Sequence, residues 1–188
     1  MRKIFVIVWG LVALTTSAHA DVVTSLPPGR ATIEWSKMLP IVEAFARHQR
    51  EGFSPSQMKL VEELKKLPTS AAKARRVHQF FLKYRYERYS GISWRSPAEF
   101  ERVGGICRDF ALAKYLVLRA AGLSDTHMRV VQMNPLGAGE SHAVLLVESE
   151  EGLLVLADEL PQPQPFSYFS RWKVFGSFVE GKYIFHGM

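Results

Sequence analysis

The sequence contains a single cysteine, Cys107, in a position where a thiol could act as a nucleophile. Gly104 and Gly105 precede it, and apolar residues at helical spacing follow it. This pattern places the thiol in the first turn of a helix. The unpaired N–H groups and the positive end of the helix dipole favour the thiolate there, and the thiolate is the reactive form of cysteine. The charge of Arg108 acts in the same direction.

A cysteine nucleophile needs a base that holds its proton and a third group that orients the base. His142 begins one predicted strand, and Asp158 ends the next. The start of one antiparallel strand and the end of its neighbour lie at the same edge of a sheet, so a tight hairpin brings these side chains together. If the helix of Cys107 begins at that edge, a Cys–His–Asp triad results. Glu159 is the alternative orienting carboxylate.

Each member of this triad also has a purely structural explanation. A lone cysteine is often a small buried apolar residue, His142 could cap a turn, and Asp158 could simply end the sheet. The combination favours catalysis, because an export signal, a cysteine at a helix start and matching strand ends occur together.

Capping patterns predict the helices that precede the sheet. Ser54-Pro55-Ser56-Gln57 has the form of a capping box with proline at the first helical position, and the helix ends before Pro68. Ser70 can cap a second helix. Ser96, followed by proline, can cap a short third helix that leads to the glycines.

The cysteine-bearing helix runs to Gly122, and the pattern then changes to short β-rich segments separated by turns. These segments are residues 128–133, 143–147 and 153–157. A further strand is expected at 172–175 or 183–185, and the proline-rich stretch 160–165 is interpreted as a loop. The order predicts an α+β fold, in which N-terminal helices and the central cysteine-bearing helix pack on an antiparallel sheet.

The first twenty residues have the pattern of a secretory signal peptide. Arg2 and Lys3 form a basic start, residues 4–14 are apolar, and Ala18-His19-Ala20 is a cleavage site. The apolar run is shorter than the roughly 20 residues of a membrane span, although an uncleaved anchor is the alternative. We therefore expect cleavage after residue 20 and a single periplasmic domain formed by residues 21–188.

Net charge and cysteine count limit the partners and the stabilising bonds expected for this protein. The formal charge of +6 falls to +4 without the two basic residues of the signal peptide, and the basic stretch 73–88 fits a solvated helix face. Export and the lack of a recognised motif argue against a nucleic-acid partner. With one cysteine, no internal disulfide can form, so packing must stabilise the domain.

Four segments carry a family resemblance: WRSPAEF (94–100), GGICRDFALAKY (104–115), SHAVL (141–145) and LADEL (156–160). In order and spacing they resemble the bacterial transglutaminase-like cysteine peptidases, whose best-known members are LapG-type periplasmic proteases. The resemblance is strongest over residues 77–160 and includes motif order and spacing. It implies a papain-like or transglutaminase-like core with Cys107 as nucleophile, His142 as base and Asp158 as the orienting residue.

The same resemblance implies a protein substrate and a place in biofilm release. LapG-type enzymes cleave large surface adhesins and are restrained by an inner-membrane receptor that senses cyclic diguanylate. Two alternatives stay open: a transglutaminase-type transfer of the acyl group to an amine, and a non-catalytic module that keeps the fold and binds an envelope protein.

Calcium is a point of departure from the family pattern. In LapG-type proteins, acidic residues flank the cysteine and serve as calcium ligands, whereas Ile106 and Arg108 stand at those positions here. A guanidinium places positive charge where the cation would sit. We therefore expect no cofactor and no calcium at this position, although Asp109 matches the family's next acidic residue. A carboxylate at position 109 also suits the first turn of a helix.

Overall fold

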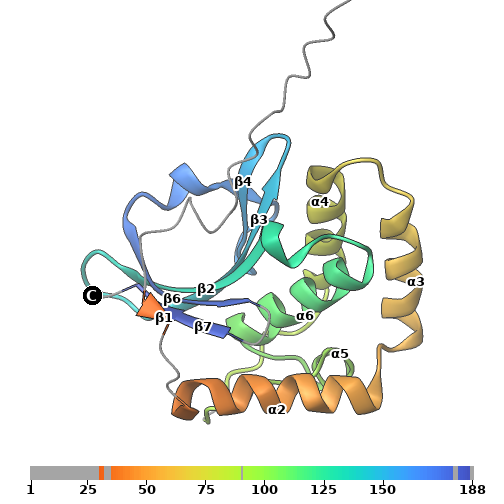
Figure 1. The fold of residues 1–188 in the computed structure, drawn as a ribbon, viewed down its shortest axis with the longest axis horizontal. Coiled ribbons are helices and arrows are strands. Elements are labelled where there is room, and N and C mark those ends of the chain that lie inside the picture. Colours follow the sequence, from red (N-terminus) through yellow and green to blue (C-terminus); the bar gives the residue numbers. More distant parts are fainter. Residues whose placement is uncertain (1–29, 32–34, 90, 180–181, 187–188) are drawn as a thin grey trace, which may run out of the picture.

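A layer of helices packs against a seven-stranded antiparallel sheet (Figure 1). The computed structural model describes residues 30–31, 35–89, 91–179 and 182–186, and the predicted signal peptide lies outside these ranges. The predicted α+β class is confirmed. No helix in the described residues combines the length and apolarity needed to cross a membrane.

Two of the predicted caps, Ser54 and Ser96, are found, and the described residues form five α-helices. They are α2 (Trp35–Glu51), α3 (Pro55–Lys65), α4 (Ser70–Phe81), α5 (Pro97–Val103) and α6 (Cys107–Ala120). Before α3, the N–H of Gln57 donates to the Ser54 hydroxyl and the N–H of Ser54 donates to the Gln57 side chain, both at 3.2 Å, which confirms the capping box. The helix α4 is capped by Thr69 instead of Ser70, because the Thr69 hydroxyl accepts the N–H of Ala72.

The helix α2 was not predicted from the sequence. Pro40 lies inside it and supplies no backbone N–H to the helix. Ile41 and Ala44 are buried in the main core, so packing against the rest of the domain stabilises this helix. Figure 1 shows α2 running along one side of the molecule, below α5 and α6.

The sheet has the strand order β1-β7-β6-β2-β3-β4-β5, and every neighbouring pair is antiparallel. The strands are β1 (Arg30–Ala31), β2 (Met128–Pro135), β3 (His142–Ser149), β4 (Gly152–Leu156), β5 (Gln164–Pro165), β6 (Trp172–Val179) and β7 (Lys182–Phe185). The three predicted central strands are confirmed as β2, β3 and β4, and both C-terminal alternatives form, as β6 and β7. The stretch 160–165 is only partly a loop, because its last two residues pair with β4 as β5.

Both faces of the sheet are buried, and adjacent strand residues divide between them. Val130 belongs to the core under the helices, whereas Val131 belongs to a second core on the opposite face. The segment after β4, with the 3-10 turn Phe166–Phe169, covers that second face. Every residue of α6 from Asp109 to Leu118 is buried, as expected for a helix at the centre of a domain.

Candidate active site

Two glycines allow the chain to turn tightly into α6. Gly104 has a φ of 77°, in the left-handed region that disfavours side chains, and a Cβ there would collide with the backbone carbonyl of Arg85. A Cβ on Gly105 would lie 2.7 Å from the side chain of Asp109. The helix start can therefore approach both neighbours only because these two residues have no side chain.

Asp109 closes the start of α6 from inside. It is fully buried, and its carboxylate accepts the N–H groups of Ile106 at 2.9 Å and Arg95 at 2.8 Å. The Tyr89 hydroxyl donates to the same carboxylate at 3.0 Å. Burial raises the pKa of Asp109, while these hydrogen bonds act in the opposite direction. This carboxylate fixes the first turn of the helix that carries the cysteine.

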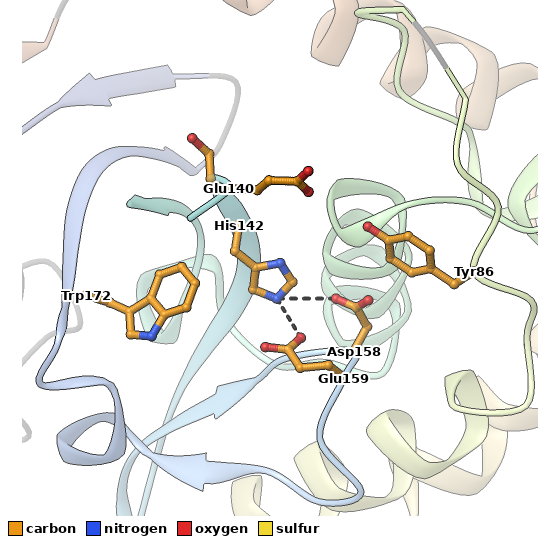
Figure 2. Close-up of a pocket in the computed structure, with 7 residues that line it drawn as sticks. Tyr86, Glu140, His142, Asp158, Glu159 and Trp172 are labelled. Atoms are coloured by element: carbon orange, nitrogen blue, oxygen red, sulfur yellow. Dashed lines mark ion pairs between the residues drawn. The ribbon is translucent and has the colours of Figure 1, made fainter. Parts of the chain in front are cut away.

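The strands β3 and β4 bring the predicted base and its orienting residue to one edge of the sheet. Leu145 pairs with Leu156, so the start of β3 lies beside the residues that follow β4. The Nε2 atom of His142 lies 3.5 Å from Oδ1 of Asp158 and 2.7 Å from Oε2 of Glu159 (Figure 2). Both candidate carboxylates therefore reach the imidazole.

These two carboxylates differ in exposure. The side chain of Asp158 is 6% exposed, and that of Glu159 is 47% exposed. Burial raises the pKa of Asp158, against the opposing effects of His142 and Lys114. Burial also disfavours the charge on Glu159, but its contact with His142 lowers the pKa below the usual value. Water screens Glu159 more than Asp158, which reduces the advantage of its shorter distance.

Cys107 approaches the imidazole from the start of α6. It is partly buried, and it lies close enough to His142 to act on the pKa of the imidazole. Burial is the largest single influence on His142 and lowers its pKa, but Cys107, Glu159 and Asp158 together raise that pKa to about 10. An imidazole that retains its proton stabilises a neighbouring thiolate. The structure thus places Cys107, His142 and Asp158 in one cluster.

A cavity of about 420 Å³ opens beside this cluster (Figure 2). It is lined by Tyr86, Glu140, Ser141, His142, Asp158, Glu159 and Trp172. The ring of Trp172 lies 6.1 Å from that of His142. Tyr86 reaches the cavity because its backbone forms a parallel bridge with Gly105, next to the cysteine turn. The cavity has the size and polar lining of a small cleft that could admit a substrate segment.

Sequence reasoning missed Tyr86, Glu140 and Trp172 as lining residues. Each lies on a segment distant in sequence from Cys107, and none has a motif of its own. The turn residues around Glu140 gave the only usable signal, because they join β2 to the strand that begins with His142.

Two groups of side chains and carbonyls offer cation ligands. One histidine and two carboxylates present ligand atoms within 4.8 Å of one another: His142, Asp158 and Glu159. The second group lies near Asp109, where the guanidinium of Arg108 donates to the carbonyl oxygens of Gly91 at 2.6 Å and Ser93 at 2.8 Å. A hard cation at the second group would have to displace Arg108 from these oxygens.

A profile of the transglutaminase-like domain matches residues 56–182 of this chain. The chain belongs to the transglutaminase-like family. This transglutaminase-like protein is similar to solved structures of LapG from Legionella pneumophila. The calcium-bound form is 29% identical with a TM-score of 0.62, and the match covers 69% of this chain and 76% of that chain. A second LapG structure is 25% identical with a TM-score of 0.63, over 84% and 90% of the two chains.

An EGTA-treated LapG shares the fold, with 24% identity and a TM-score of 0.64 over 86% of this chain and 89% of that chain. No curated protein sequence matches this transglutaminase-like protein. The predicted membership of the transglutaminase-like peptidases is confirmed. Its likeness to LapG indicates a peptidase.

The expectation of no cofactor is wrong for this family. One similar LapG structure is calcium-bound and another is EGTA-treated, so calcium binding occurs among these transglutaminase-like proteins. The prediction considered only the side chains at positions 106 and 108. Backbone carbonyls also bind calcium, and the carbonyls of Gly91 and Ser93 lie beside the cysteine helix without any sign in the sequence.

Proposed function

We propose that this protein is a thiol endopeptidase in which Cys107 is the nucleophile, His142 the base and Asp158 the residue that orients the base. One observation carries the proposal: the Nε2 atom of His142 faces the carboxylates of Asp158 and Glu159, while Cys107 is near enough to raise the pKa of the same imidazole. The carboxylates occupy the Nε2 side, so Nδ1 is the nitrogen that exchanges a proton with the thiol. This is the arrangement that nucleophilic catalysis by cysteine requires.

The reaction follows from these positions. The Cys107 thiolate attacks the peptide carbonyl, and the backbone N–H of Cys107 donates to the developing oxyanion. His142 passes its proton to the leaving amine and then takes a proton from the water that hydrolyses the thioester. Asp158 holds the imidazole in place throughout. Incubation of residues 21–188 with an extract of surface proteins, compared between wild type and Cys107→Ala, tests these roles by the new N-termini that appear.

The acyl group of the same thioester could instead be transferred to an amine, with release of the Cys107 thiolate, as the transglutaminase-like fold allows. Hydrolysis splits one polypeptide into two, whereas transfer joins two polypeptides or adds the mass of an amine. The mass of the products from one incubation, with and without an added primary amine, separates the two reactions. We expect fragments whose masses do not change when the amine is present.

The substrate and the compartment are part of the same proposal. We assign the protein to the periplasm, after removal of residues 1–20, and its substrate to the large surface adhesins. Its implied regulator is an inner-membrane receptor that senses cyclic diguanylate. These assignments rest on the signal-like N-terminus and on the resemblance to LapG-type proteases. Cell fractionation and the amount of adhesin released from cells lacking the protein test them.

The carboxylate that orients His142 can be identified by a pair of substitutions. We expect Asp158→Asn to slow alkylation of Cys107 by iodoacetamide near pH 6 by about 30-fold, less than the loss of His142 itself, because a neutral amide no longer stabilises the imidazolium. We expect Glu159→Gln to lower the same alkylation rate by about tenfold or less, because Glu159 is far more exposed than Asp158 and water screens its charge. A larger loss in Glu159→Gln than in Asp158→Asn would assign the orienting role to Glu159.

Calcium binding near the cysteine is tested by a substitution at Arg108. We expect Arg108→Glu to strengthen calcium binding by at least about tenfold, because it frees the carbonyls of Gly91 and Ser93 and adds a carboxylate. Isothermal titration with calcium after EGTA treatment measures the change. Arg108→Gln removes the charge without adding a carboxylate and is the matched control. Equal affinities in Arg108→Glu and wild type would show that the ion binds elsewhere.

A further inference from the structure

Lys114 is fully buried, which is unusual for a lysine. It lies seven residues after Cys107 in α6, and residues at that spacing share one face of a helix. Its ammonium group therefore lies on the cysteine side of α6, two turns further along. A buried ammonium is costly unless hydrogen bonds and charges compensate for its lost hydration, so its partners show what the site requires.

Those partners lie on two other elements. The Nζ atom of Lys114 donates to the carbonyl oxygen of Leu156 at 3.0 Å and lies 3.3 Å from Nδ1 of His78, on α4. On the far side of the ring, Nε2 of His78 lies 2.9 Å from the carbonyl oxygen of Leu160. An ammonium can only donate, so Nδ1 accepts and Nε2 carries the ring proton that binds Leu160. His78 is only 1% exposed.

The two bound carbonyls bracket the acidic residues of the site. Leu156 is the last residue of β4, Leu160 follows four residues later, and Asp158 and Glu159 lie between them. The segment is thus held at both ends by one lysine–histidine pair. The charge of Lys114 also favours the ionised form of both Asp158 and Glu159.

The charges around Lys114 agree with this arrangement. Burial lowers its pKa to about 8, while Asp158 and Glu159 act to raise it. Burial and the lysine charge lower the pKa of His78 to about 4, so the ring is neutral at physiological pH. The ring of Phe110, on α6 itself, lies 5.8 Å from Nζ.

We propose that Lys114 is a positioning residue of the thiol site, which acts with His78 to fix the segment bearing Asp158 and Glu159 against His142. This inference rests on the proposed function. It gives α6 two roles at once: its first turn carries the nucleophile, and its third turn holds the segment that orients the base. Lys114 itself touches neither substrate nor Cys107.

The test compares Lys114→Met with Leu112→Ala. Methionine has nearly the volume of lysine but no ammonium group. Leu112 is fully buried on the opposite side of α6, since two residues correspond to 200° of helical rotation, and its truncation destabilises the helix without touching the lysine–histidine pair. Two quantities are measured in both variants and in wild type: hydrogen exchange of the Leu160 amide, which bonds to the carbonyl of Ala157, and alkylation of Cys107 at pH 6.

The two variants are compared at an equal loss of melting temperature. We expect the Leu160 amide to exchange at least about tenfold faster in Lys114→Met than in Leu112→Ala. We expect Cys107 to be alkylated at least about fivefold more slowly in Lys114→Met than in Leu112→Ala. Equal rates of Leu160 amide exchange and of Cys107 alkylation in Lys114→Met and Leu112→Ala would overturn the proposal. A wild-type thiol that reacts at pH 6 like a free cysteine would instead refute the proposed function. The exchange comparison would still decide whether Lys114 fixes the segment.

His78 provides a second test that leaves the lysine in place. His78→Phe removes both ring contacts, whereas His78→Gln keeps one acceptor for Lys114 and one donor for Leu160. We expect fast exchange of the Leu160 amide in His78→Phe and near wild-type exchange in His78→Gln. Wild-type exchange and alkylation in a folded His78→Phe would overturn the role of the pair.

Discussion

Cys107→Ala is expected to abolish cleavage, with a loss on the order of 10⁴- to 10⁶-fold in rate, because it removes the sulfur atom that would form the acyl-enzyme. The substitution removes one sulfur atom from a partly buried position, so the melting temperature should change by only a few degrees. New N-termini generated in an extract of surface proteins, quantified by mass spectrometry, give the rate.

Cys107→Ser is the matched control. It replaces the thiol with a hydroxyl of similar size, but the hydroxyl does not ionise at neutral pH, so this variant should be nearly as inactive. Circular dichroism and thermal melting establish that both variants are folded. A folded Cys107→Ala variant that still cleaves at the wild-type rate would remove Cys107 from the mechanism.

The second large effect concerns the pH dependence of alkylation. Near pH 6, iodoacetamide should react with Cys107 on the order of 100-fold faster in wild type than in His142→Ala. The pKa of His142 is raised to about 10, so the imidazole stays protonated up to that pH and favours the thiolate beside it. Without His142, the rate should rise only as the pH approaches the free-cysteine pKa of about 8.5.

The difference between the two proteins should therefore shrink above about pH 9, where a free thiol is ionised without help. His127→Ala is the matched control, since His127 pairs with Glu148 and lies outside the cavity lining. Its profile should follow wild type. Identical profiles for wild type and His142→Ala would show that the thiol and the imidazole are not coupled, and would favour the non-catalytic binding module.

Local patterns in the sequence predicted most of the elements because the forces behind them act over a few residues. The capping box at Ser54 and the short β-rich runs of β2 and β3 between turns are examples. Thr69 and Ser70 are both good caps, so the pattern could not choose between them. Pro40 obscured α2, whose stability comes from burial of its apolar face in the core.

The calcium prediction failed for a related reason. Side-chain identities at positions 106 and 108 are visible in the sequence, but the carbonyls of Gly91 and Ser93 are brought beside them only by the path of the chain. Lys114 illustrates the same limit. In a helix that precedes a sheet, a lysine is expected in water, and only the packing of α4 and β4 around α6 shows that it is buried.

By itself, the sequence determined which residues stand at the ends of elements: Cys107 after two glycines, His142 at a strand start and Asp158 after the next strand. Strand register and helix capping follow from short-range sterics and hydrogen bonding, so these positions could be inferred. Only the tertiary structure decided that Glu159 reaches His142 more closely than Asp158 does, that Tyr86 lines the cavity, and that Lys114 lies beneath the acidic segment. Such contacts depend on the packing of elements distant in sequence, and no local pattern of residues encodes that packing.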